Sequence, residues 1–412
     1  MESKEIFSMA LNISLPWYVE NVTMNSGANK GTGQIDIYIN FKLGSKFKDT
    51  TGIECPVYDT IQKSWQHLNF FEHKCFIHAR VPRITTSTNN VKMVSVPWAR
   101  PSSGFTLMFE AFGMLLIESE MPVLRAASII KIHDTRLWRI LDYWITQARL
   151  KDTQSDVVNL GIDETSIKKG HNYVTLAVDM DKRRVIHATP GKDKQTMKSI
   201  KDYLELKDCP SEQIKNICMD MSPSFISGQM DYFPKSQITF DKFHIMKIIN
   251  EAMDSVRKYE RKAHIELKGY KYLFLRNKDK LSNSDRETKS YFLNLYEDLG
   301  KAYRLKELFN DMWDFNKIEE AEGYLAYWCD LAEESKIQPF MKVVNTIKAH
   351  WTGVTNFFQS RLNNGILEGI NSKIQLAKKR ARGYRNIDNF INMIYFITGK
   401  LKFDYPLYLS RV

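Results

Sequence analysis

The fold of this chain is decided by residues 157–190, which read VVNLGIDETSIKKGHNYVTLAVDMDKRRVIHATP. An apolar run at 157–162 ends in two acids, Asp163 and Glu164, and two β-rich runs follow at 173–178 and 184–189. The polar residues at 179–182 suit a hairpin turn between those runs. The stretch therefore predicts a three-stranded meander with Asp163 at a sheet edge, where a rigid scaffold can aim a carboxylate at a bound ion. Acids at strand ends are common, so this position alone is weak evidence.

A second acid of the same kind follows downstream. The short apolar run at 214–219 ends in Asp220, and Ser222 and Pro223 then suit the N-cap and first position of a helix. A helix is predicted at 194–206, another strand at 237–240, and a helix after it. Three strands followed by alternation of helices and strands predict a mixed sheet with helices on its faces.

Two carboxylates on neighbouring strands repel each other unless a cation lies between them. Mg²⁺ prefers oxygen ligands and is usually held by one or two carboxylates together with substrate phosphates. A third acid would complete a site for two ions, and the best candidate is Glu368, in the first turn of a helix predicted at 366–379. The simpler interpretation of Glu368 is an acid favoured by the dipole at a helix N-terminus.

Four blocks of sequence carry a resemblance to a known family. They are GIDETSIKKGHNYVTLAVDMD at 161–181, CMDMSPSFISGQMDYFP at 218–234, ITFDKFHI at 238–245 and NNGILEGINSKIQLAKKRARGYRN at 363–386. In order and spacing the chain resembles bacterial insertion-sequence transposases of the ISL3 family, within the wider group of DDE transposases. The resemblance implies an RNase H-like fold whose acidic triad, Asp163, Asp220 and Glu368, holds two Mg²⁺ ions that Mn²⁺ can replace. Asp241 is open to two interpretations, a secondary metal ligand or a helix cap.

Bulk composition agrees with a nucleic-acid partner. The chain has 412 residues, 59 Lys and Arg against 48 acids, a net charge of +11 and a pI near 9.1. Such a basic balance favours a polyanion. No apolar run approaches the roughly 18 residues that a membrane span needs. The first residues lack the pattern of a signal peptide, and the five cysteines are odd in number and unpatterned. We therefore expect a cytoplasmic bacterial protein without disulfides or a membrane.

Residues 1–95 predict a small β-rich module, because apolar residues alternate in runs such as QIDIYINF at 34–41. In the resembling family this region is a zinc ribbon with paired Cys-x-x-Cys knuckles, and this sequence departs from that pattern. Five side chains have the chemistry of zinc ligands, namely Cys55, His67, His73, Cys75 and His78. A structural zinc needs four well-spaced ligands, and without paired knuckles we predict a metal-free module.

The pattern becomes helical at 96–150, with helices predicted at 105–118, 122–129 and 134–150. The short break before the last helix is typical of a helix-turn-helix motif, whose second helix would place Arg136 and Arg139 near a major groove. The alternative is a plain helical linker, because helix pairs are common and the break lacks a glycine.

An all-helical insertion is predicted at 246–358, between a first catalytic part at 151–245 and a last part at 359–412. Its basic residues suit either phosphates or an ordinary solvated surface. Trp351 is a candidate for stacking on an unpaired base, with core packing as the alternative.

The densest basic cluster follows Glu368 and consists of Lys373, Lys378, Lys379, Arg380, Arg382 and Arg385. Its place beside the predicted metal site favours contact with DNA phosphates. Lys168, Lys169 and His171 suit either phosphates or a solvated hairpin edge.

These features predict an α+β protein with a β-rich N-terminal module, a helix-turn-helix-like segment and an RNase H-like mixed-sheet catalytic domain that contains a large all-α insertion. The predicted function is a transposase that binds terminal inverted repeats and cleaves and joins double-stranded DNA, acting as a homodimer on the element ends and a target. A catalytically inactive or domesticated DNA-binding derivative is the alternative, and a nuclease without strand transfer is a weaker one.

Overall fold

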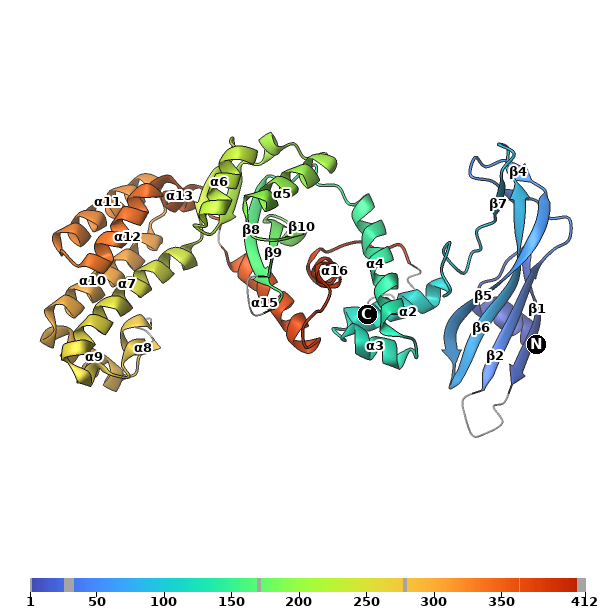
Figure 1. Cartoon of the computed structure of the whole chain (residues 1–412), viewed down its shortest axis with the longest axis horizontal. Helices are drawn as coiled ribbons and strands as arrows, with labels where there is room; N and C mark the ends of the chain where they lie inside the picture. Colours follow the sequence, from blue (N-terminus) through green and yellow to red (C-terminus); the bar gives the residue numbers. More distant parts are fainter. Residues whose placement is uncertain (1, 26–32, 169–171, 277–279, 363, 406–412) are drawn as a thin grey trace. The chain divides into compact units, whose positions relative to one another are not determined.

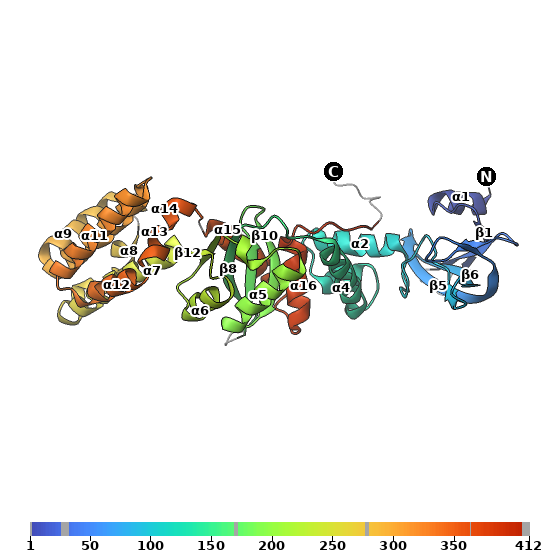
Figure 2. The same cartoon turned by 90° about the horizontal axis from the view of Figure 1, so that it is seen from above.

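The computed structural model describes residues 2–25, 33–168, 172–276, 280–362 and 364–405. Its contacts divide the chain into two compact units, one of Met1–Ala148 with Lys402–Val412 and one of Arg149–Leu401. Both units combine sheets with helices, which confirms a mixed α/β protein (Figures 1 and 2). In the described part of the chain, no helix has both the length and the apolar character to cross a membrane.

The first unit begins with a β-rich module, as its alternating pattern predicts. Its elements are α1 Ser3–Ala10, β1 Trp17–Asn25, β2 Gln34–Phe41, β3 Phe47–Lys48, β4 Glu54–Cys55, β5 Val57–Phe70, β6 His73–Thr85 and β7 Val91–Met93. The main sheet has the order β1-β2-β6-β5, with β7 paired to β6. Ile37, Ile77 and Trp65 bury one face, and the alternation of strand side chains places His78 and Asp36 on the other.

Three helices follow the module: α2 Leu107–Glu118, α3 Val123–Ile129 and α4 Asp134–Lys151. Thr106 caps α2, because its side chain accepts a hydrogen bond from the backbone N–H of Phe109. The apolar side of α4 is buried at Leu137, Ile140 and Leu141. The turn at 130–133 includes Lys131 in the left-handed region at φ 55°, so it reverses the chain without the glycine that such turns often use.

The second unit is built on a sheet with the order β10-β9-β8-β11-β12. Its strands are β8 Asn159–Ser166, β9 Tyr173–Asp179, β10 Arg184–Pro190, β11 Asn216–Met219 and β12 Gln237–Phe240. The first three pair antiparallel as the predicted meander, whereas β8, β11 and β12 pair in parallel. One expectation is wrong in detail. Asp163 lies inside β8 rather than beyond its end, because pairing with β9 continues to Ser166.

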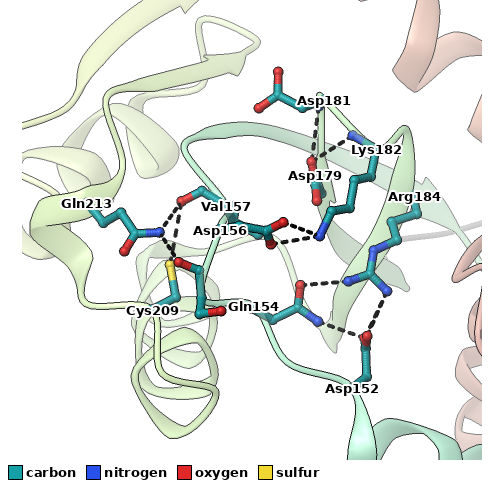
Figure 3. A network of polar contacts seen from close by, with 11 residues as sticks. Asp152, Gln154, Asp156, Val157, Asp179, Asp181, Lys182, Arg184, Cys209 and Gln213 are labelled. Atoms are coloured by element: carbon teal, nitrogen blue, oxygen red, sulfur yellow. Dashed lines mark hydrogen bonds and ion pairs between the residues drawn. The ribbon is translucent and has the colours of Figure 1, made fainter.

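Polar contacts fix the segment that leads into β8 (Figure 3). The Arg184 guanidinium donates to the Asp152 carboxylate at 2.9 Å and to the Gln154 side-chain oxygen at 3.1 Å. The Lys182 ammonium contacts the Asp156 carboxylate at 2.6 Å. In the hairpin turn, the Asp179 carboxylate accepts from the backbone N–H groups of 181 and 182. The segment is thereby held to the β9–β10 hairpin.

Helices cover this sheet. They are α5 Lys194–Leu206, α6 Pro223–Tyr232, α15 Gly365–Arg380 and α16 Ile387–Thr398, with the short η1 Ser211–Gln213 before β11. The α16 helix packs on β10, where the Tyr395 hydroxyl lies 2.8 Å from the Ala188 backbone N–H and accepts its hydrogen bond. Figure 1 shows α15 passing β8. Its close approach depends on Gly161, because a Cβ there would lie 2.7 Å from Leu367.

The predicted insertion is helical throughout its described elements. They are α7 Lys242–Ala263, η2 Ile265–Leu267, α8 Lys271–Leu275, α9 Asn283–Leu295, α10 Glu297–Asp311, η4 Met312–Asp314, α11 Ile318–Glu334, α12 Gln338–Ala349, α13 Trp351–Thr355 and α14 Phe357–Ser360. Its core contains Trp328, whose ring meets Phe309 at 4.8 Å. Both views show α7 to α12 as one helical group (Figures 1 and 2). At its return, the Asn356 amide donates to the Ile238 carbonyl at 3.1 Å, which anchors the insertion to β12.

Candidate active site

Three aspartates lie level on three neighbouring parallel strands at one edge of the second sheet, Asp163 within β8 and Asp220 and Asp241 just after β11 and β12. Parallel pairing aligns Gly161 with Cys218, so Asp163 and Asp220 each lie two residues further along. Pairing of Met219 with Phe240 likewise makes Asp220 and Asp241 the next residues of their strands. Because the carboxyl ends of parallel strands meet at the same edge, the register brings these carboxylates together.

Asp163 is a half-buried carboxylate with few favourable contacts. One oxygen accepts from the backbone N–H of Glu164 at 2.7 Å, and the other accepts from the Asn371 side-chain amide at 2.6 Å. The pKa of Asp163 is raised to about 6, chiefly by burial and also by the Asp220 and Asp241 charges, while the Glu164 N–H and His244 act against this rise. The ionised form is thus held in an environment that disfavours its charge.

Asp220 and Asp241 have different surroundings. The Asp220 carboxylate accepts from the backbone N–H of Ser222 at 3.0 Å, at the start of α6. Asp241 is only 3% exposed and caps α7, accepting from the backbone N–H groups of Phe243 and His244. It also accepts from the His244 ring at 2.8 Å and from the Asn364 amide at 3.0 Å. Four donors favour a capping role for Asp241, because they occupy the oxygens that a cation would need.

Glu368 is exposed in the first turn of α15, where the sequence predicts it. Four residues earlier Asn364 contacts Asp241, and three residues later Asn371 contacts Asp163. Residues at these spacings share one face of a helix. The Glu368 side chain therefore belongs to the helix face that carries both contacts to the acidic edge.

The α15 helix is fixed to β8 by a row of polar side chains. Asn371 donates to Asp163, Gln375 donates to the Thr165 hydroxyl at 2.8 Å, and the Lys378 ammonium donates to the Ser166 carbonyl at 2.6 Å. Lys378 is half-buried, and burial lowers its pKa. Lys378 therefore has a packing role inside the unit, and its contact with a DNA phosphate stays a prediction.

The described residues contain no group of three or more His, Cys, Asp or Glu side chains arranged to hold a metal ion. The donor chemistry of Asp163 and Asp220 nevertheless fits a hard divalent cation, since both supply carboxylate oxygens. A cation between them would offset the burial and like-charge repulsion that raise the pKa of Asp163. The two ionised carboxylates are therefore more favourable with a divalent ion bound between them than without one.

The other predicted DNA-contacting side chains divide into two groups. Exposed are Arg136, Arg139, Lys168, Lys373, Lys379, Arg380, Arg382 and Arg385. The Arg136 guanidinium lies over the Phe105 ring at 4.2 Å, which gives it a packing role as well. Lys169 and His171 lie outside the described residues.

Two of the candidate zinc ligands of the N-terminal module, His67 and His78, are hydrogen-bonded to other side chains. The His67 ring bonds to the Thr106 hydroxyl at 2.8 Å, and the His78 ring contacts the Ser64 hydroxyl at 2.7 Å and the Asp36 carboxylate at 2.8 Å. Burial raises the pKa of the Cys75 thiol to about 12. Cys55 is buried in β4, and His73 begins β6. The metal-free module remains a prediction, which the zinc content of chelator-washed protein tests.

Comparisons with known proteins match both the catalytic sheet and the helices before it. A transposase family model, the DDE transposase of ISL3, matches residues 160–394. This chain belongs to the ISL3 family of transposases. Its residues 94–145 match the helix-turn-helix domain of the same family, which confirms the motif over the plain helical linker. DDE transposases are DNA-cleaving nucleotidyl-transfer enzymes that generally use divalent metal ions.

Curated relatives cover most of the transposase. One is the transposase for insertion sequence element IS1001 of Bordetella parapertussis, 24% identical over 368 residues, which are 86% of this chain and 89% of that protein. Another is the transposase for insertion sequence element IS1557 of Mycobacterium tuberculosis, 25% identical over 358 residues, which are 79% of each chain. The likeness therefore extends beyond the residues that the transposase family model matches.

Sequence reasoning missed several supporting side chains of the transposase. Asn364 and Asn371 contact the acids but resemble ordinary helix-surface residues in sequence, and only their spacing from Glu368 hints at a shared face. Glu110 is fully buried among Arg100, Ser103 and Trp144 in the helix-turn-helix segment. Its sequence signal is a single acid inside the apolar helix LMFEAFGMLLIE.

Proposed function

We propose that this transposase binds the terminal inverted repeats of its element and catalyses metal-dependent cleavage and strand transfer on an RNase H-like sheet. The observation that carries the proposal is the acidic edge, where Asp163 within β8 and Asp220 just after β11 lie level on neighbouring parallel strands and α15 contacts Asp163 beside Glu368. The strand order, with an antiparallel meander joined to two parallel strands, supports the RNase H-like assignment.

Some of the proposed residues would hold metal ions at the acidic edge, and others would orient the acids or add positive charge. Asp163, Asp220 and Glu368 would together hold two Mg²⁺ or Mn²⁺ ions. When bound, such ions supply activation of the attacking oxygen and stabilisation of the leaving oxygen in an in-line displacement. Asn371 orients Asp163 through its amide. The His244 ring, bonded to Asp241, adds positive charge near both Asp163 and Asp220 when it is protonated, and that pairing raises its pKa.

The DNA-contacting surfaces follow from the exposed basic residues. Arg139 and Arg136 on α4 would approach the major groove of the repeat. Lys373, Lys379, Arg380, Arg382 and Arg385, at and beyond α15, would position the cleaved strand through its phosphates. Lys168, with Lys169 and His171, would add phosphate contacts near β8. Two ends must be brought together, so we propose a homodimer that works on nucleoid DNA in the bacterial cytoplasm.

DNA with the native flanks of the gene tests the proposal. Purified protein is incubated with these fragments and a target plasmid in Mg²⁺, Mn²⁺ or EDTA. Ends bearing 3′-hydroxyls and joined products with either ion, and neither in EDTA, support the transposase. Specific binding of the ends without cleavage under any ion would favour the catalytically inactive DNA-binding derivative. Cleavage without joining would favour a nuclease.

A further inference from the structure

A cavity of about 250 Å³ lies along the first half of α7, in the unit that carries the acidic edge. Its lining includes Phe243, Met246, Lys247 and Asn250 from α7 and Lys271 and Leu275 from α8. The spacing of the α7 residues places them on one face of that helix. The cavity is below the roughly 300–1,000 Å³ of most ligand pockets, so it suits one planar group better than a whole cofactor.

The cavity begins next to the acids. Phe243 is two residues beyond Asp241, and its ring meets the His244 ring edge-on at 5.9 Å. His244 in turn bonds to Asp241 and acts electrostatically on Asp163 and Asp220. A DNA strand held at the acidic edge would therefore pass the mouth of this cavity.

The lining has the chemistry of a nucleobase site. The Phe243 ring is 59% exposed although it could bury its area in a core. Met246 and Leu275 supply apolar contacts. Asn250 adds a polar side chain to the same lining.

Charged side chains of both signs line the cavity. Lys247 and Lys271 line it together with two acids, Glu251 and Asp254, which lie further along α7 from the acidic edge. Asp254 is paired with Arg257 at 2.7 Å. The lysines are therefore the lining groups that can contact the phosphates flanking a bound base.

Trp351, the sequence-based candidate for stacking, is partly buried against the core of the same unit. We propose that the α7–α8 cavity instead binds one unpaired nucleobase of the DNA strand processed at the acidic edge. Phe243 stacks on the base, with Met246 and Leu275 beside it. Lys247 and Lys271 contact the neighbouring phosphates. This inference rests on the proposed function, because it needs a DNA end at that edge.

A cycle of protein and DNA changes tests the cavity. Wild type and Phe243→Ala are titrated, as full chains, with native element ends and with ends made abasic at one position at a time around the cleavage point. Phe243→Ala should bind native ends about tenfold more weakly than wild type, because the stacking contact with the base is lost. At one abasic position the same substitution should have almost no effect, because the interaction is already gone. Phe243→Trp should restore binding.

Tyr259→Ala is the matched control, since Tyr259 is a 72% exposed aromatic on the same helix outside the cavity lining. It should leave the affinity for native ends unchanged. Sequence-specific binding by wild type with no position coupled to Phe243 would overturn the cavity inference alone. Equal binding of native and shuffled ends by wild type would overturn the proposed function, and the cavity inference with it.

Discussion

Glu110 in the first unit and Asp163 in the second are both shielded from solvent, but they have different neighbours. Glu110 accepts from the Arg100 guanidinium at 2.9 Å, the Trp144 indole N–H at 2.8 Å and the Ser103 hydroxyl at 2.6 Å. Asp163 faces other acids and accepts only from Glu164 and Asn371 among the contacts found. A saturated carboxylate stabilises a fold, whereas one left beside like charges is suited to recruit a cation.

The largest expected effect falls on the saturated acid. Glu110→Ala would leave the Arg100 charge without its partner in a buried site, and breaking such pairs is strongly destabilising. We expect a loss of about 3 kcal/mol in the free energy of unfolding, measured by urea titration of tryptophan fluorescence. Glu110→Gln keeps some hydrogen bonding and should cost less. A loss below about 1 kcal/mol for the alanine variant would show that the network is not what holds α2 to α4.

The opposite sign is expected for Asp163→Asn in metal-free protein. The folded pKa of about 6 lies above the ordinary value of 3.8, so ionisation of Asp163 destabilises the folded protein. This destabilisation is absent below pH 4 and reaches its full size above pH 6. In EDTA at pH 7 the variant should be more stable than wild type by on the order of 2 kcal/mol, and the difference should vanish near pH 4.

Divalent ions should reverse that order. Mg²⁺ should raise the melting temperature of wild type and not of Asp163→Asn, because bound ions stabilise the folded state by mass action. Asp36→Asn is the matched control, since Asp36 is a buried acid of the N-terminal sheet that already accepts from Gln34 and His78. The same gain from Mg²⁺ in all three proteins would remove Asp163 from the site.

The sequence predicts the elements of the second unit well, but it does not predict the long-range contacts around Asp163. The bounds of α5 and β12 agree with the expected ranges at 194–206 and 237–240, because capping and alternation are local properties. The contact of Asn371 with Asp163 joins residues 208 positions apart. Only the tertiary packing of α15 on β8 creates it. Likewise, the charge of Lys378 predicts a phosphate contact but gives no sign of the hydrogen bond that its ammonium donates to the Ser166 carbonyl.

Asn371 offers a smaller test of how the unsaturated acid is positioned. Asn371→Ala removes the amide that orients Asp163, and loss of such an orienting contact costs about tenfold in metal affinity or more. Titration of Mn²⁺ by calorimetry should show this change. Gln375→Ala, one helical turn further on the same face, is the control and should leave the affinity unaltered. Equal losses in both variants would indicate a general loosening of α15 instead.

The smallest effects are expected for alanine substitutions of the two arginines of α4, Arg136 and Arg139. Arg139→Ala should weaken binding to the element ends by on the order of 1 kcal/mol and lower the slope of log affinity against log salt by about one. Arg136→Ala should also lower the melting temperature, because its guanidinium packs on Phe105. These changes are measured by fluorescence anisotropy at several salt concentrations. Unchanged affinity in both variants would remove α4 from recognition.

The central claim is that the acidic edge, completed by Glu368, cleaves and joins DNA. The most direct measurement compares wild type, Glu368→Gln and Asp388→Asn in Mg²⁺-dependent cleavage of the native flanks. Asp388 is the matched control, an exposed acid in the first turn of the neighbouring α16. We predict cut and joined products from wild type and Asp388→Asn, and binding without cleavage from Glu368→Gln. Cleavage by Glu368→Gln at the wild-type rate would contradict the account.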